Sequence, residues 1–99
     1  MPVEIEPLLR SAVLANDAVI EGDDLIGDPT EVALLVVAAK AGIDAHELRA
    51  RNPRVGEVPF DSAHKYMVTV TTGDDAAAHM KGAPEAVIER CRRWRDAVG

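Results

Sequence analysis

Aromatic residues, cysteine and long apolar runs are scarce in this chain of 99 residues. The aromatic residues are Phe60, Tyr66 and Trp94, so an exposed ring among them would indicate a functional surface. The single cysteine, Cys91, excludes an internal disulfide framework and suits a reducing cytosol. The longest apolar run, 32–39, is far shorter than the roughly 20 residues that cross a bilayer. The start of the chain shows no signal-peptide pattern. The chain is expected to be soluble and monomeric.

Positive charge is also in short supply, because the net charge is −6. An acidic surface repels polyanions, so nucleic acid is not an expected partner. Hydrophobic residues make up 47% and charged residues 28%, which is an ordinary globular balance. The length allows one domain, which we place at 1–99.

Several chemical motifs are missing. The sequence contains neither Gly-x-x-x-x-Gly-Lys-Ser/Thr nor Gly-x-Gly-x-x-Gly, the two commonest phosphate-binding patterns. His46, His64, His79 and Cys91 lack the spacing of metal ligands, and no serine or cysteine has an evident base nearby. We therefore expect neither a metal site nor catalytic residues. A small zinc-binding domain that uses these four residues is one alternative.

The first half of the chain predicts helices. Apolar spacing predicts a helix over 7–17, and a polar loop is expected at 21–24. Asp44 followed by Glu47 predicts the start of a short helix, which Asn52-Pro53 ends.

The clearest helix signals surround 28–42. Asp28 is a good N-cap, Pro29 suits the first helical position, and Glu31 completes a capping-box pattern. Because 32–39 is apolar on all sides, this helix is predicted to be buried on most faces. Gly42 is expected to end it.

The second half predicts strands. An extended segment is expected at 55–60, a strand at 65–72, a turn at 73–75 and an antiparallel return at 76–81. Pro84 then begins a last helix. One apolar face of that helix is predicted to carry Val87, Ile88, Cys91 and Trp94. Together these elements predict an α+β fold with an antiparallel sheet flanked by helices.

Three segments carry a resemblance to a known family. They are 27–34 (Gly-Asp-Pro-Thr-Glu-Val-Ala-Leu), 58–70 (beginning Val-Pro-Phe-Asp-Ser) and 81–91 (beginning Lys-Gly-Ala-Pro-Glu). In this order and spacing they resemble the nucleotide-binding (N) domain of cation-transporting P-type ATPases, in the calcium-pump and sodium-pump branch. The stretch 12–18 also resembles that family, so the similarity extends over nearly the whole chain.

The resemblance implies an ATP site. Phe60 would stack on the adenine ring and Lys65 would approach the nucleotide. Both roles are physically reasonable, because stacking on a base contributes about 1–3 kcal/mol and a lysine can meet phosphates in several poses.

The resemblance implies four more contacts. Lys81 would line the floor of the pocket, and Gly82 would leave room for adenine. Glu31 would lie near the adenine amino group, and Met67 would be an apolar pocket residue. Lys81 and Gly82 also precede a predicted helix N-terminus, where backbone N–H groups favour anions.

The resemblance further implies an ATP-driven cation pump whose parent chain uses Mg-ATP, and the high share of Ala, Val, Asp and Arg indicates a bacterial source. This domain would lie on the cytoplasmic side of the plasma membrane. It would carry ATP to an aspartate on a separate phosphorylation domain, with an actuator domain as a further partner in the same chain. Because the sequence lacks an Asp-Lys-Thr-Gly-Thr segment, we expect it to bind ATP without hydrolysing it.

Each matched residue also has a simpler interpretation. Phe60 could be a core residue, and a non-nucleotide interaction or regulatory module would bury it. Glu31 could cap its own helix. Lys65 could be a solvated edge charge. Met67 and Cys91 would serve the core first.

Other positions qualify the resemblance. Where relatives commonly have arginine, this chain has His64 and Tyr66, so phosphate contacts should be weaker or depend on His64 protonation. Trp94 is expected to pack rather than bind a ligand. Four arginines are expected to form a solvated face near a helix C-terminus: Arg90, Arg92, Arg93 and Arg95.

Overall fold

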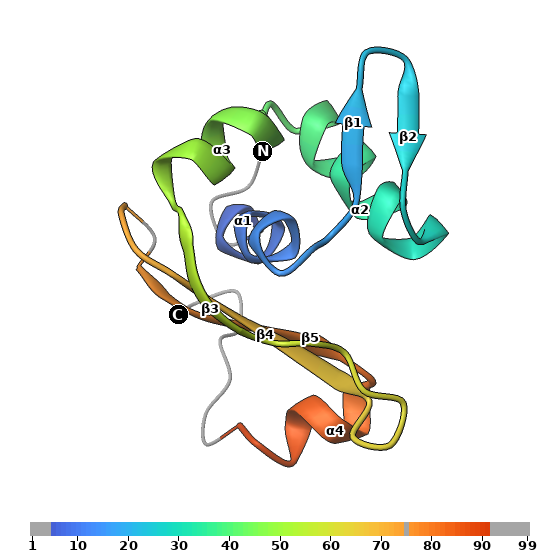
Figure 1. Cartoon of the computed structure of the whole chain (residues 1–99), viewed down its shortest axis with the longest axis vertical. Helices are drawn as coiled ribbons and strands as arrows, with labels where there is room; N and C mark the ends of the chain where they lie inside the picture. The colour runs from blue at the N-terminus through green and yellow to red at the C-terminus, as the bar shows by residue number, and fades with distance from the viewer. Residues whose placement is uncertain (1–4, 75, 92–99) are drawn as a thin grey trace.

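Three helices cover one face of a three-stranded antiparallel sheet, and a short fourth helix lies against the other face (Figure 1). This computed structural model describes residues 5–74 and 76–91. The helices are α1 (Glu6–Leu14), α2 (Pro29–Lys40), α3 (Ala45–Arg51) and α4 (Pro84–Ile88). The strands are β1 (Val19–Glu21), β2 (Asp24–Ile26), β3 (Arg54–Val58), β4 (Tyr66–Thr71) and β5 (Ala77–Gly82). The predicted α+β class is confirmed.

The main sheet has the order β3-β4-β5, with β4 in the centre. Successive side chains of a strand point to opposite faces. On β4, Met67, Thr69 and Thr71 are buried towards the helices, whereas Val70 is exposed on the other face. The hairpin of β4 and β5 forms where the sequence predicts it.

Helix α1 occupies the centre of the helical layer (Figure 1) and contacts α2, α3 and β5. Two of its buried side chains, Val13 and Leu14, belong to an apolar cluster that also contains Ala18, Leu35, Ala38 and Leu48. The Thr69 hydroxyl donates to the Leu14 carbonyl at 3.0 Å and so ties the sheet to the end of this helix.

Both predicted N-caps form. The Asp28 carboxylate accepts from the backbone N–H groups of Thr30 and Glu31, at 3.0 and 3.2 Å. Asp44 accepts from the N–H of Glu47 at 3.1 Å. These bonds satisfy backbone donors that the first turn of a helix leaves unpaired.

The prediction that α2 is buried on most faces is wrong. Leu35 and Ala38 are its buried residues, whereas Val37 is 50% exposed. The reason is geometric, because α1 and α3 pack against one side of α2 and the sheet lies beyond α1 (Figure 1).

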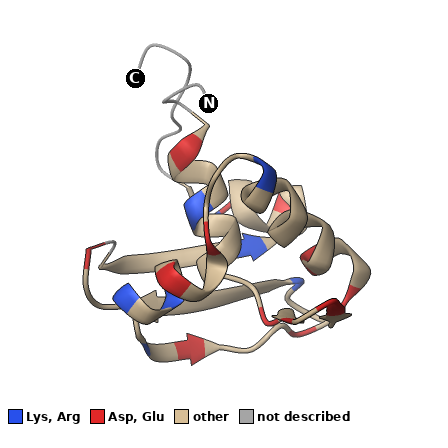
Figure 2. Cartoon of the chain, turned by 90° about the horizontal axis from the view of Figure 1, so that it is seen from above, with Lys and Arg blue, Asp and Glu red and all other residues tan. Residues whose placement is uncertain are grey.

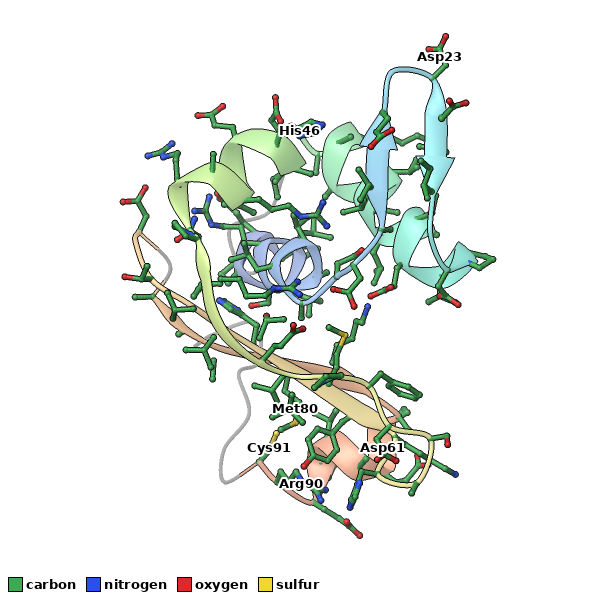
Figure 3. All side chains as sticks on the ribbon, in the orientation of Figure 1. Asp23, His46, Asp61, Met80, Arg90 and Cys91 are labelled. Carbon is green, nitrogen blue, oxygen red and sulfur yellow. The ribbon has the colours of Figure 1, made fainter. Side chains whose placement is uncertain are left out.

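The polar loop predicted at 21–24 is the end of a hairpin. Strands β1 and β2 pair antiparallel, with Glu21 opposite Asp24, and Gly22-Asp23 forms the turn. Gly22 has φ +61°, a conformation that glycine adopts without strain. Asp23 marks the tip of this hairpin, which projects away from the main sheet (Figure 3).

The predicted apolar seam of the last helix is also wrong in part. Helix α4 ends at Ile88, which is 69% exposed, and Cys91 is exposed rather than buried. Arg90 lies with its guanidinium 4.4 Å from the centre of the Tyr66 ring, so it packs on an aromatic face instead of being only solvated. Four residues in these predictions lie outside the described residues: Trp94, Arg92, Arg93 and Arg95.

No helix within 5–74 and 76–91 has both the length and the apolar character that crossing a membrane would need.

The uneven burial of α2 gives a test of the packing. Leu35→Ala should lower the free energy of unfolding by about 2–5 kcal/mol, because it opens a cavity in the core. Val37→Ala, on the exposed side of the same helix, should change it by less than about 0.5 kcal/mol. Urea denaturation of both variants measures the difference, and similar losses would show that α2 is covered on both sides.

Candidate functional site

A cavity of about 430 Å³ lies between the start of α2, the end of β5 and the loop after β3. This volume is within the range of small-molecule sites. Its lining residues are Asp17, Asp28, Thr30, Glu31, Phe60, Met67, Lys81 and Gly82. Five of the six predicted site residues are therefore brought together, and Lys65 is the one outside the lining.

Phe60 lies in the loop after β3 and borders the cavity with a ring that is 60% exposed. The core interpretation of Phe60 is therefore wrong, as is the burial that a non-nucleotide module would require. An exposed ring beside a cavity offers a flat apolar surface on which a planar ligand can stack.

Met67 supplies a buried wall of the same cavity. It is 3% exposed, because it projects from β4 into the space between the sheet and the helices. Met67 therefore belongs to the buried core and also lines the cavity. A flexible thioether adapts readily to a flat ligand.

Glu31 and Lys81 form an ion pair inside the cavity, with 2.5 Å between Lys81 Nζ and Glu31 Oε2. The Glu31 side chain is 15% exposed and the Lys81 side chain is 27% exposed. The same Glu31 oxygen accepts from the backbone N–H of Asp17 at 3.1 Å. These partners replace the Asp28 N–H that a full capping box would use, so only the Asp28 half of the predicted box forms.

Sequence reasoning missed Asp17, Asp28 and Thr30 as lining residues. Asp17 lies in the 12–18 segment that carries part of the resemblance, and the N-cap pattern had already marked Asp28 for a structural role. Asp17 pairs with Arg54 at 2.9 Å, while Asp28 remains bonded to the α2 backbone. Acidic and basic positions are spread over the helices, strands and loops (Figure 2).

The charge of this lining is mostly negative. Asp17, Asp28 and Glu31 each contribute a carboxylate, and Lys81 is the cation among the described lining residues. Because Lys81 is paired with Glu31, the cavity favours ligands with hydrogen-bond donors over groups of high negative charge.

The backbones of Lys65 and Gly82 meet at one edge of the cavity. Lys65 has φ +63°, an uncommon value for a residue other than glycine. The Ala83 N–H donates to the Lys65 carbonyl at 2.9 Å. A Cβ atom at Gly82 would lie 2.3 Å from that carbonyl oxygen and 2.7 Å from Tyr66 Cα. Close packing of the backbone therefore requires glycine at position 82 even when no ligand is bound.

The loop that joins Phe60 to Lys65 is held by Asp61. Its carboxylate accepts from the backbone N–H groups of Ala63 and His64, at 2.6 and 3.3 Å. These bonds lower the pKa of Asp61, since they favour the ionised form. The Lys65 N–H also donates to the Asp61 carbonyl at 2.6 Å.

The histidines and Cys91 lie on separate parts of the fold. His79 bonds with Ser11 and Thr71 between α1 and the sheet, and His46 bonds with the Ile20 carbonyl. Figure 3 shows Cys91 on the α4 side of the sheet and His46 in the helical layer on the other side. Over 5–74 and 76–91, no set of three His, Cys, Asp or Glu residues could hold a metal ion.

Comparisons with known proteins agree with the resemblance. Residues 4–98 match the family described as P-type ATPase, cytoplasmic domain N. A cation-transporting ATPase of Synechocystis is 41% identical over 92% of this chain, and a calcium-transporting ATPase of Listeria monocytogenes is 45% identical over 85%. A probable cation-transporting ATPase of Mycobacterium tuberculosis is 40% identical over all of it. The matched regions are 10%, 10% and 12% of those three proteins.

The contact at Gly82 predicts a loss of stability on adding one methyl group. Gly82→Ala should lower the free energy of unfolding by about 1–3 kcal/mol, because the methyl group meets backbone atoms that cannot move away easily. Gly56→Ala on β3 is the matched control, since its new Cβ would lie 3.7 Å from Val70, an ordinary contact. Equal midpoints of urea unfolding for both variants would contradict the close packing.

The Asp61 loop predicts a pH dependence. Because the folded-state pKa of Asp61 is lowered, its bonds stabilise the loop above the ordinary aspartate pKa of about 3.9 and are lost as pH falls through the lower folded value. The amide proton shifts of Ala63 and His64 should therefore titrate below about pH 3.9. They should stop titrating in Asp61→Asn, and an unchanged titration in that variant would assign the effect to another group.

Proposed function

The chain belongs to the family of P-type ATPase cytoplasmic N domains, and we propose that it binds an adenine nucleotide in the cavity bordered by Phe60, Met67 and Lys81. The observation that supports this most directly is the exposed Phe60 ring beside a cavity of nucleotide size. Adenine would lie against that ring, with Met67 as the opposing apolar contact.

Polar groups of the cavity complement the adenine edge. The Glu31 carboxylate can accept a hydrogen bond from the exocyclic amino group, as the resemblance implies. Glu31 is held by Lys81 and by the Asp17 N–H, so it would not have to be ordered when the ligand binds. Such preorganisation favours a small, rigid ligand.

The phosphates would extend out of the cavity towards Lys65. Its backbone adjoins Gly82 at the cavity edge, while its side chain is exposed to solvent. A single mobile lysine provides limited attraction for a triphosphate, and the cavity carboxylates oppose it. We therefore propose binding led by adenine, with Kd on the order of 0.1 to several mM, or about 4–5.5 kcal/mol.

Mg²⁺ would add little to binding by this domain. Asp17 is paired with Arg54, Asp28 with the α2 backbone and Glu31 with Lys81, so their carboxylates already have partners. A hard cation needs several oxygen ligands at once. The metal would act on ATP elsewhere in the parent protein.

The matched relatives are about ten times longer than this chain, since it spans 10–12% of their length. We propose that it works within such a chain, an ATP-driven cation pump with this domain on the cytoplasmic side of the membrane. There it would present ATP to a separate phosphorylation domain. On its own it would bind ATP without hydrolysing it.

Amide chemical-shift titrations with ATP and then AMP test the site. Shifts should concentrate on Glu31, Phe60, Met67, Lys81 and Gly82, with similar affinities for the two nucleotides, because adenine dominates binding. Absence of shifts at millimolar ATP would rule out this function for the chain.

Phe60→Ala tests the stacking contact itself. It should weaken ATP binding roughly fivefold or more, because stacking on a base contributes about 1–3 kcal/mol. Val55→Ala is the control, since Val55 is 65% exposed on β3 and does not line the cavity. Unchanged ATP affinity in Phe60→Ala would refute the stacking mechanism.

A further inference from the structure

Asn16 is a buried polar residue next to the cavity but not in its lining. It is 1% exposed and follows the end of α1. Its Nδ2 donates to the Glu31 carbonyl at 2.9 Å, and its Oδ1 accepts from the Ala18 N–H at 2.8 Å. A buried amide is stable only when its polar atoms are bonded, so these two contacts fix its orientation.

Two arginines hold the backbone that carries Asn16. Arg49 Nη2 donates to the carbonyls of Asn16 and Val13, at 3.1 and 3.4 Å. Arg54 Nη2 donates to the carbonyls of Asn16 and Leu14, at 3.2 and 3.4 Å. The guanidinium groups thus satisfy carbonyls that the end of α1 leaves unpaired. They anchor this segment to α3 and β3.

Glu31 is held at both ends by the same segment. The Asn16 side chain binds its main-chain carbonyl, and the Asp17 N–H binds its carboxylate. A helix residue is ordinarily free to choose among side-chain rotamers. Here the main chain and the carboxylate of Glu31 are both hydrogen-bonded to the same short segment, Asn16-Asp17, which the two arginines anchor.

We propose that Asn16 is a positioning residue of the nucleotide cavity, acting through Glu31 to aim its carboxylate at the ligand. This inference rests on the proposed function. It extends the site beyond the residues that touch the cavity, to a polar side chain in the core behind it. Because Glu31 also pairs with Lys81, displacement of Asn16 would disturb both charged groups of the cavity.

The chain offers a matched control in Asn52. This residue is 2% exposed and donates through Nδ2 to the Leu48 carbonyl at 3.0 Å. It is a buried asparagine at a helix end, like Asn16, but the carbonyl that its Nδ2 binds belongs to α3, and Asn52 does not line the cavity. Asn16→Ala and Asn52→Ala should both lower the midpoint of urea unfolding.

Nucleotide affinity should separate the two variants. Asn16→Ala should raise the Kd for ATP and for AMP by a common factor of about three- to tenfold, whereas Asn52→Ala should leave both within about twofold. In a Glu31→Ala background, Asn16→Ala should add less than about twofold. Equal losses in the two asparagine variants, or an undiminished effect without Glu31, would overturn the proposal.

A measurement without nucleotide distinguishes this inference from the proposed function. The side-chain carboxyl ¹³C signal of Glu31 should move in Asn16→Ala and stay in place in Asn52→Ala. If ATP binds but that signal is unmoved, the positioning role is refuted and the function stands. If the signal moves but wild-type protein binds neither nucleotide, the proposed function fails while the control of Glu31 by Asn16 holds. Should Asn16→Ala not fold, Asn16→Ser enters the same comparisons with the same criteria.

Discussion

The ion pair between Glu31 and Lys81 joins the helical layer to the sheet at the point where the cavity lies. Glu31 lies in the first turn of α2 and Lys81 near the end of strand β5, 50 residues apart in sequence. Both side chains are largely removed from water, and an ion pair in that setting is stable only if its geometry is supported from outside. That support comes from the Asp17 N–H and from the anchored segment before it. The same contacts therefore join the helical layer to the sheet and fix the positions of the polar groups in the cavity.

The edge of the cavity at Gly82 depends on backbone geometry rather than on charge. Lys65 adopts a positive φ, and the carbonyl that this conformation presents is bound by the Ala83 N–H. Gly82 allows the two strands to approach closely enough for this bond. Strained backbone persists only where its surroundings determine it, and such positions often adjoin functional sites. The loop that carries Phe60 is consequently fixed at both ends, by the Asp61 bonds and by the contact with β5.

Local signals in the sequence predicted much of this fold. The caps at Asp28 and Asp44 depend on neighbouring residues, so their patterns could be read directly. Strand β4 followed from its β-branched residues, and β5 followed as the antiparallel return after the turn. The burial of α2 could not be predicted, because its apolar pattern is uniform and the packing of α1 and α3 decides which side is covered. The exposure of Cys91 was missed for a related reason, since α4 ends sooner than its apolar spacing suggested.

The residues of the candidate site likewise divide into those that the sequence predicted and those that only the fold revealed. Phe60, Lys81 and Gly82 were recognisable because they lie in short contiguous motifs, and the fold brings them to one cavity. Asn16 lies in the 12–18 segment that carries part of the resemblance, but its role could not be predicted from that segment. The role arises from a bond to the main-chain carbonyl of Glu31, which a residue of any type at position 31 would supply. Residues that bind a ligand directly are constrained by its chemistry, whereas residues behind them are constrained by the tertiary geometry. A side chain that is buried, polar and bonded to a cavity residue is therefore informative once the fold is known, because its local sequence does not reveal which residue it binds.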